Sequence, residues 1–145
     1  MLTQRQTLLA IFAITAAVLI GAWGFEYFGY APCELCLMQR YAYYAVIPLS
    51  LLFSFLDPKL QRGGLYLVGL IMLGSMIFGI YHSGVEWKFW EGPATCTGAV
   101  TGGLPDLTKK AVMCDQPAIR ILGLSLAGWN AIVSAAVSVL AFRKA

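Results

Sequence analysis

Two cysteines and an arginine stand close together where an apolar run begins. Cys33, Cys36 and Arg40 occupy positions i, i+3 and i+7. In a helix their side chains share one face, within about 60° of one another, while Glu34 and Gln39 are expected to point elsewhere. The positive end of a helix dipole favours a thiolate, and the arginine adds a permanent positive charge. The pattern predicts a redox-active dithiol.

The composition predicts whether the chain that carries this dithiol lies in water or in a lipid bilayer. Of the 145 residues, 59% are hydrophobic and only 12% are charged, whereas a soluble domain carries about 25% charged residues. The mean hydropathy is +0.74. The net charge is +3, and no basic cluster is long enough to indicate binding to nucleic acid. A bilayer is therefore the expected surroundings.

Four apolar runs are each near the length of about 20 residues that crosses a bilayer. They are residues 8–24, 35–56, 64–81 and 121–142. Every backbone polar group in a bilayer must be paired within its segment, so helices are expected. The first run is longer than the apolar part of a signal peptide, about 7–15 residues. The sequence predicts an all-α membrane protein, a single domain of residues 1–145 built as a four-transmembrane-helix bundle.

The charges near the helix ends predict the orientation, because cations near those ends mark the cytoplasmic side. Both termini and the turn at 57–62 share one side, which carries five cations against one acid. Two loops, 25–34 and 82–120, then lie on the outer side and hold all four cysteines. Lys109 and Lys110 lie deep in the longer loop and count little. Disulfides persist on the outer face of a bacterial membrane.

Small residues in the last two runs predict close helix packing. They form two stripes: Ser75, Gly79 and Ser83; and Gly123, Ala127, Ala131 and Ala135. Asn130 falls within the last run and is expected to bond to a neighbouring helix. Aromatic residues at 87–90 are expected to anchor the longer loop at the membrane surface, as a short helix.

The four cysteines allow three interpretations. Cys96 and Cys114 form a second pair, and two structural disulfides would staple the loops. Zinc ribbons use two C-x-x-C pairs, but this second pair is widely spaced and His82, the one histidine, is not at ligand spacing from a cysteine. Redox exchange is the third interpretation and is favoured, because C-x-x-C pairs have tuned potentials. No metal site is therefore predicted.

Electrons arriving at the C-x-x-C pair need an acceptor. The chain has no haem-attachment motif and no nucleotide-binding loop. A lipid-soluble two-electron carrier, a quinone, suits a dithiol at the membrane boundary. Arg40 would stabilise an anionic quinone oxygen or the thiolate facing it; the alternative is an arginine that extends to lipid head groups.

The order of these motifs resembles the DsbB family of bacterial inner-membrane disulfide-generating proteins. The resemblance rests on Pro32, Cys33 and Cys36 followed by Arg40, and on the segments 79–87, 92–96, 114–117 and 123–130. It covers nearly the whole chain. The spacing of the second cysteine pair is shorter than in the family's best-known members. The glycine-rich segment 97–103 between them is expected to be flexible.

The resemblance implies a role for each cysteine. Cys96 would be attacked by a reduced periplasmic DsbA-like protein of the thioredoxin fold, and Cys114 would pass the electrons on through a transient bond to Cys33. Cys36 would stack on quinone as a thiolate, in a charge-transfer contact. Ubiquinone would take the electrons in air and menaquinone without it.

The resemblance also places Arg40 beside the quinone and lets His82 face it. The protein would lie in the inner membrane, with both termini cytoplasmic and both loops periplasmic. Two alternatives stay open from the residues alone: a related membrane protein that runs electrons to a different periplasmic client, and a non-enzymatic four-helix scaffold with static disulfides.

Overall fold

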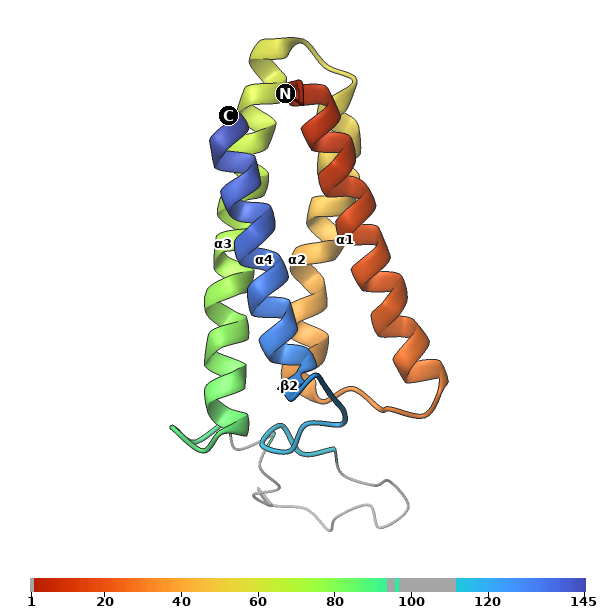
Figure 1. The fold of residues 1–145 in the computed structure, drawn as a ribbon, viewed down its shortest axis with the longest axis vertical. Helices are drawn as coiled ribbons and strands as arrows, with labels where there is room; N and C mark the ends of the chain where they lie inside the picture. The colour runs from red at the N-terminus through yellow and green to blue at the C-terminus, as the bar shows by residue number, and fades with distance from the viewer. Residues whose placement is uncertain (1, 94–95, 97–111) are drawn as a thin grey trace.

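The computed structural model describes residues 2–93, 96 and 112–145 (Figure 1). This part of the chain contains four helices: α1 (Gln4–Tyr27), α2 (Glu34–Ser54), α3 (Pro58–Glu86) and α4 (Leu126–Lys144). Two short antiparallel strands, β1 (Arg120–Ile121) and β2 (Leu124–Ser125), precede α4. The glycine-rich segment 97–103 and the lysines at 109 and 110 lie outside the described residues.

Three of the described helices, α1, α3 and α4, are long and apolar enough to cross a membrane. The second helix, α2, carries Glu34, Gln39 and Arg40 near its start and several tyrosines, which lower its hydropathy. The protein is thus mostly helical with three candidate spans, and a membrane crossing by α2 is a matter for proposal.

Three of the described helices, α1, α2 and α4, begin at side chains that cap free backbone N–H groups. Thr3 accepts from the N–H of Gln6 in a capping box that starts α1. Ser125 accepts from the N–H of Gly128 at the start of α4. Pro58 begins α3, where a missing N–H costs nothing. Because α3 begins at Pro58 and ends at Glu86, it is longer than the apolar run 64–81 that predicted it.

The fourth helix begins at Leu126 instead of residue 121. Residues 120–125 form a hairpin, in which Leu122 has φ +53° and Gly123 has φ +83°. Two consecutive positive φ angles are what a tight two-residue hairpin turn needs. The indole N–H of Trp129 donates to the carbonyl of Ile121 at 2.9 Å and ties the hairpin to α4. Gly123 therefore lies outside the helical stripe to which the sequence assigned it.

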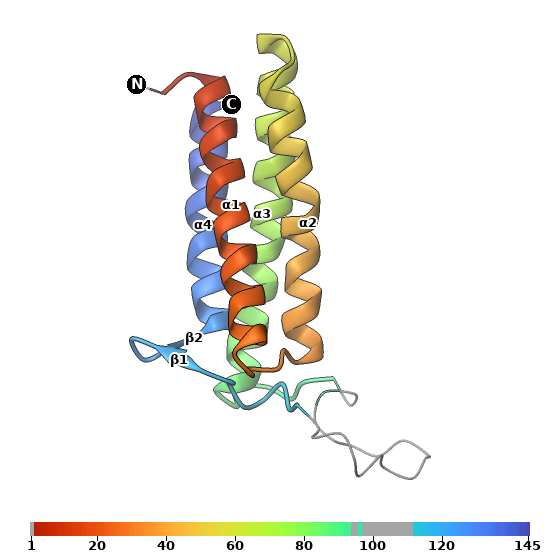
Figure 2. The ribbon, with the colours of Figure 1, turned by 90° about the vertical axis from the view of Figure 1, so that its right-hand side faces the viewer.

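The two ends of the bundle differ in what they hold. Both termini and the α2–α3 turn lie at one end, whereas the α1–α2 connection and the hairpin lie at the other (Figures 1 and 2). Cys33, Cys96 and Cys114 all belong to one buried cluster at this second end. We call this the cysteine end and the opposite one the terminal end.

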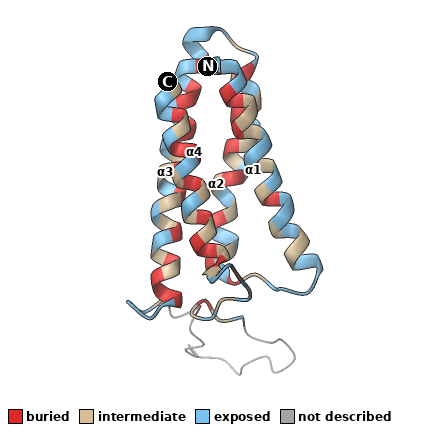
Figure 3. Ribbon diagram, viewed as in Figure 1, coloured by how far each residue is buried: buried red, intermediate tan, exposed pale blue. Residues whose placement is uncertain are grey.

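The core runs along the facing sides of the four helices, as the buried segments in Figure 3 show. Its fully buried members come from every helix, among them Ile11, Val46, Met72 and Val137. Helices α3 and α4 pack most extensively. A Cβ added at Gly79 would lie 3.0 Å from the backbone nitrogen of Ala131, so the predicted close approach of small residues is confirmed for this pair.

Asn130 bonds to neighbouring helices, as its position in the sequence predicted. Its amide Nδ2 donates to the Ser75 hydroxyl on α3 at 3.4 Å, and the Tyr43 hydroxyl on α2 donates to its Oδ1 at 2.5 Å. The Ser134 hydroxyl also donates to Ser75 at 3.0 Å. This buried polar network joins three helices.

The aromatic segment after α3 is not a helix, contrary to the sequence expectation. Lys88 has φ +62°, which no helix continues through. The chain instead turns back, so that the indole N–H of Trp90 donates to the carbonyl of Tyr81 at 2.9 Å. The Trp90 and Tyr81 rings stack, with an interplanar angle of 10°.

Candidate functional site: a cysteine centre beside an apolar cavity

The C-x-x-C motif forms the start of α2. Cys33 is the N-cap residue, and its sulfur accepts the backbone N–H of Cys36 at 3.2 Å. Capping holds Cys33 outside the first turn and puts Cys36 inside it. The structure thus confirms the predicted position of the dithiol at a helix N-terminus.

Cys33 and Cys36 carry free thiols in this structure. Their sulfurs and a ring nitrogen of His82 all lie within 4.8 Å of one another. The Cys33 sulfur is 3.5 Å from Nε2 of His82, and both residues are buried. Residues 49 positions apart in the sequence therefore form one group of two thiols and an imidazole.

The hydrogen bond of Cys33 to the Cys36 sulfur, together with burial, holds the pKa of the Cys33 thiol well above its usual range. The bond from the Cys36 N–H acts the other way, as expected at a helix N-terminus, but it is the weaker effect. The helix dipole was expected to favour a thiolate at this dithiol, and at Cys33 the hydrogen bond to Cys36 and burial outweigh that effect. This sulfur keeps its proton at neutral pH.

The second cysteine pair lies directly against the first. Cys96 and Cys114 form a disulfide, and the Cys114 N–H donates to the carbonyl of Cys96 at 3.0 Å. Both pack with Cys33, Leu35 and Val85 in one cluster, to which Cys36 is peripheral. The exposed fractions are 3% for Cys96 and 1% for Cys114. Both sulfur-bearing residues of the loop disulfide are therefore buried.

His82, on α3, lies next to the Cys33 thiol. Its Nδ1 is 3.2 Å from the side-chain amide nitrogen of Gln39, and its Nε2 is 3.9 Å from Oε1 of Glu86. The backbone of Cys114 also lies against the imidazole. His82 is 1% exposed and is not among the residues lining the cavity beside α2. Its neighbours Gln39 and Cys36 both line that cavity.

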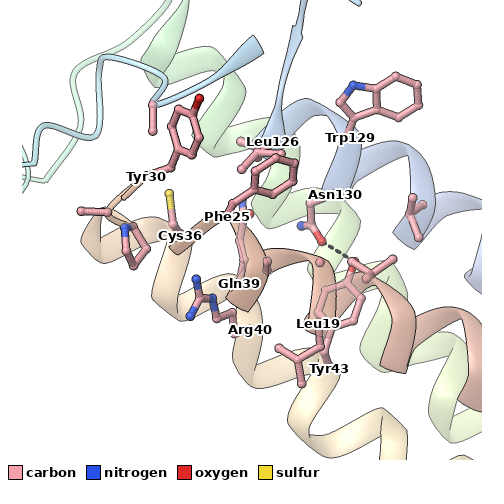
Figure 4. Close-up of a pocket in the computed structure, with 18 residues that line it drawn as sticks. Leu19, Phe25, Tyr30, Cys36, Gln39, Arg40, Tyr43, Leu126, Trp129 and Asn130 are labelled. Atoms are coloured by element: carbon pink, nitrogen blue, oxygen red, sulfur yellow. Dashed lines mark hydrogen bonds between the residues drawn. The ribbon is translucent and has the colours of Figure 1, made fainter. Parts of the chain in front are cut away.

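The cavity lies between α1, α2 and α4 and has a volume of about 290 Å³ (Figure 4). Most of its lining is apolar or aromatic, including Leu19, Phe25, Tyr30 and Trp129. Its polar lining comes mainly from α2 and α4: Cys36, Gln39, Arg40, Tyr43 and Asn130. The volume is near the lower end of the range for pockets that bind small organic molecules, about 300–1,000 Å³.

Arg40 is held in place by an acid of α1. Its guanidinium donates to Oε2 of Glu26 at 2.7 Å, and the arginine side chain is only 11% exposed. Arg40 and Cys36 line the same cavity, as their shared helix face predicted. The ion pair also ties the start of α2 to the end of α1.

Three residues of this site escaped the sequence reasoning. Gln39 was expected to point away, but it is buried and contacts His82; its position three residues after Cys36 puts it within about 60° of that cysteine, a signal that was available. Glu86 follows His82 by one helical turn. Glu26 has no local signal, since its bond to Arg40 spans two helices.

The comparisons with known proteins agree with this geometry. The family model described as disulfide bond formation protein DsbB matches residues 4–143. An uncharacterized protein of Rickettsia prowazekii is 29% identical over 138 residues, which are 87% of this chain and 78% of that protein. No solved structure matches the chain.

Relatives with a printed function carry the family's name. A disulfide bond formation protein B of Azoarcus sp. is 31% identical, over 95% of this chain and 90% of its own. Another from Albidiferax ferrireducens is 30% identical, over 85% of this chain and 79% of its own. With its paired cysteines gathered at one end of a helical membrane bundle, this chain belongs to the DsbB family of disulfide bond formation proteins.

Proposed function

We propose that this protein is a thiol-disulfide:quinone oxidoreductase of the bacterial inner membrane. It would reoxidise a periplasmic DsbA-like protein of the thioredoxin fold and pass the electrons to membrane quinone. The observation that carries the proposal is the position of Cys36, which lies beside the Cys33 thiol and also lines the cavity of about 290 Å³ with Arg40. The Cys36 sulfur thereby adjoins both the Cys33 thiol and the apolar cavity.

The proposed membrane arrangement places all four helices across the bilayer, with residues 1–145 as one domain. Helix α2 has 21 residues, which at 1.5 Å each span about 31 Å, close to the hydrocarbon thickness of about 30 Å. The termini would be cytoplasmic and the two cysteine loops periplasmic. The shared location of both termini and the α2–α3 turn supports this orientation.

The proposed exchange begins at the loop disulfide. A client thiolate attacks Cys96 and releases Cys114, and the second client thiol then resolves the mixed disulfide. Cys114 attacks Cys33 of an oxidised Cys33–Cys36 pair, forms a Cys33–Cys114 bond and releases Cys36. Cys96 attacks Cys114, which restores the loop disulfide and leaves Cys33 and Cys36 reduced. The packing of Cys33 against Cys96 and Cys114 supports this route.

The pairing in the structure corresponds to the end of that sequence of exchanges. The loop disulfide is closed, and the dithiol is reduced. To close again as a disulfide, Cys33 and Cys36 must lose two electrons and their protons. The Cys33 sulfur is 3.5 Å from His82 Nε2, so we assign His82 the removal of the Cys33 proton. The resemblance lets His82 face the quinone, but since His82 does not line the cavity, the role we propose for it acts through Cys33.

The cavity residues fit a quinone. An apolar and aromatic lining suits a hydrophobic ring, while Cys36, Gln39 and Arg40 gather at its polar side. A bound quinone, ubiquinone or menaquinone, would accept two electrons and two protons. Arg40 would orient a quinone oxygen and stabilise negative charge there, and Glu26 would fix its guanidinium. Tyr43 is bonded to Asn130 at the deep side of the cavity.

The experiment that tests the function measures quinone reduction by the purified protein with a reduced thioredoxin-fold client, followed by the loss of quinone absorbance. We expect Cys36→Ser to abolish turnover and Ser50→Ala, at a bonded site in the body of α2, to leave it unchanged. A Cys36→Ser protein that reduces quinone at the normal rate contradicts the proposal.

A second arm tests the entry point. In Cys114→Ser, the lone Cys96 thiolate should attack the disulfide of an oxidised client, which forms a Cys96–client disulfide and releases one client thiol. The adduct is visible as a mass shift that reducing agent reverses. A static scaffold predicts no adduct and no quinone reduction. An accessible Cys96 that forms no adduct would move the entry point to another cysteine.

A further inference from the structure

We propose that the reduced protein binds one Zn²⁺ ion at the cysteine centre, between the sulfurs of Cys33 and Cys36 and Nε2 of His82, with the Glu86 carboxylate as the fourth ligand. Sequence spacing argued against a metal site because His82 is far from any cysteine along the chain. The fold removes that objection by bringing His82 to 3.5 Å from Cys33.

The distances match a tetrahedral ion. Zinc bonds of about 2.3 Å to sulfur and 2.0–2.1 Å to nitrogen and oxygen put neighbouring ligand atoms about 3.3–3.8 Å apart. The Cys33 sulfur is 3.5 Å from His82 Nε2, and Glu86 Oε1 is 3.9 Å from that nitrogen. The two sulfurs and the imidazole all fall within 4.8 Å of one another, whereas Glu86 is not part of that group. Three ligands are therefore in place, and the Glu86 carboxylate must move toward the sulfurs to become the fourth.

The structure also offers the space and an uncommitted ligand atom. A cavity of about 30 Å³, enough for one ion or one water, is lined by Cys33, Cys36 and Glu86 but not by His82. It gives room on the side of the two sulfurs and the carboxylate, and His82 approaches from behind Cys33. The Glu86 side chain is 4% exposed, and its Oε2 has no hydrogen-bond partner. A buried carboxylate oxygen without a partner is costly, and a cation beside it would relieve that cost.

The imidazole is supported as zinc ligands usually are. Metal-binding histidines bond to a second group through their other ring nitrogen, and His82 Nδ1 is 3.2 Å from the Gln39 amide. With the amide carbonyl turned toward it, Nδ1–H donates to Gln39 and Nε2 is free to bind the ion. Binding to the two thiols releases two protons, and the resulting pair of thiolates balances the charge of the ion.

Such binding would depend on redox state. The oxidised Cys33–Cys36 disulfide offers no thiolate, so only the reduced protein should bind. A bound ion would occupy both thiolates and protect them from oxidation. It would thus inhibit the proposed turnover reversibly. The binding itself does not depend on which electron acceptor the protein uses.

The test is a titration of the reduced, full-length protein with Co²⁺, which reports tetrahedral sulfur ligation by its colour. A Cys96→Ser/Cys114→Ser background removes the loop thiols, and the wild-type protein is titrated alongside. We expect one equivalent to bind, with sulfur-to-cobalt charge-transfer bands and intense visible bands of a tetrahedral ion, and Zn²⁺ to bleach them.

The variants identify the ligands. In that background, His82→Ala should weaken binding about 100-fold and Glu86→Gln about tenfold, whereas Ser50→Ala should not change it. Wild-type protein with Cys33 and Cys36 oxidised should give no colour, a comparison that needs no substitution. The proposal is overturned by reduced protein that stays colourless, by equal binding in both redox states, or by unchanged affinity in His82→Ala. None of these measurements follows quinone reduction. They therefore test metal binding even if the proposed quinone activity is wrong.

Discussion

The cysteine end and the body of the bundle treat their buried polar groups differently. In the body, the hydroxyls of Thr15 and Ser50 each donate to a carbonyl one turn earlier at 2.7 Å, and that of Ser138 donates across to Gly69 at 2.9 Å. Among the described residues, the buried side-chain atoms without a partner are all at the cysteine end: Ser83 Oγ, Glu86 Oε2 and Asp115 Oδ1.

This difference separates the polar groups that stabilise the bundle from those that remain available for chemistry. Within a bilayer an unpaired polar group costs several kcal/mol. In the body of the bundle the hydroxyls of Thr15, Ser50 and Ser138 accordingly donate to backbone carbonyls. At the cysteine end the thiols, His82 and Glu86 keep capacity for protons, electrons or an ion. A chain selected for stability alone would pair or remove such groups.

The largest expected effect comes from Arg40 at the cysteine end. Arg40→Ala should lower kcat/KM for quinone about 100-fold, or about 3 kcal/mol, because the cavity loses its fixed positive charge. Arg62→Ala, at the terminal end where the guanidinium lies 6.0 Å from the Tyr66 ring centroid, is the matched control. Steady-state rates at several quinone concentrations measure both variants. Equal rates would mean that Arg40 serves only to hold α1 through Glu26.

A packing change on α3 should act on stability instead. Gly79→Leu forces a side chain against the Ala131 backbone and should lower the free energy of unfolding by about 1–3 kcal/mol. A Cβ added at Gly74 on the same helix would meet no atom within 4 Å, so Gly74→Leu controls for the added leucine. Unfolding in mixed micelles measures the difference. If both variants unfold alike, the close α3–α4 approach contributes nothing.

Raising the pH should destabilise the reduced protein through Cys33. An unfolded cysteine ionises near its ordinary pKa of 9.0, whereas the bond to Cys36 and burial keep folded Cys33 protonated to higher pH. The stability of the reduced form is therefore present below pH 9 and lost above it, by up to about 1.4 kcal/mol per pH unit.

Thermal unfolding of reduced protein between pH 8 and 10 measures this loss. Cys33→Ala is the control and should show a smaller decrease, which reflects only the other ionising groups. Parallel decreases in the two proteins would show that the Cys33 thiol ionises as readily in the folded chain as in the unfolded one.

The smallest effect compares two serines. Ser138→Ala removes an interhelical hydrogen bond to Gly69 and should cost about 0.6 kcal/mol, the average for such bonds in a membrane. Ser83→Ala removes a buried hydroxyl without a partner and should cost nothing or stabilise slightly. Unfolding of both variants under one condition checks the order. A larger loss for Ser83→Ala would reveal a partner for that hydroxyl in the membrane.

Much of the helical framework was predictable because its signals are local. Apolar runs marked the helices, and small residues together with Asn130 marked the α3–α4 contact. The start of α4 was missed, because the apolar residues before it form a hairpin that depends on positive φ angles at Leu122 and Gly123. The segment around Lys88 was missed for a similar reason, since hydropathy does not report where the backbone reverses.

The sequence by itself determined the dithiol at the start of α2, the face that Cys36 shares with Arg40, and the second cysteine pair. These follow from spacing, which a helix converts directly into direction. Only the tertiary structure decided that His82, Glu86 and the loop disulfide meet at Cys33 and that Glu26 holds Arg40. It also decided that the hydrogen bond to Cys36 and burial raise the pKa of the Cys33 thiol. Each of these depends on contacts between helices and on the burial they produce, and no local pattern records either.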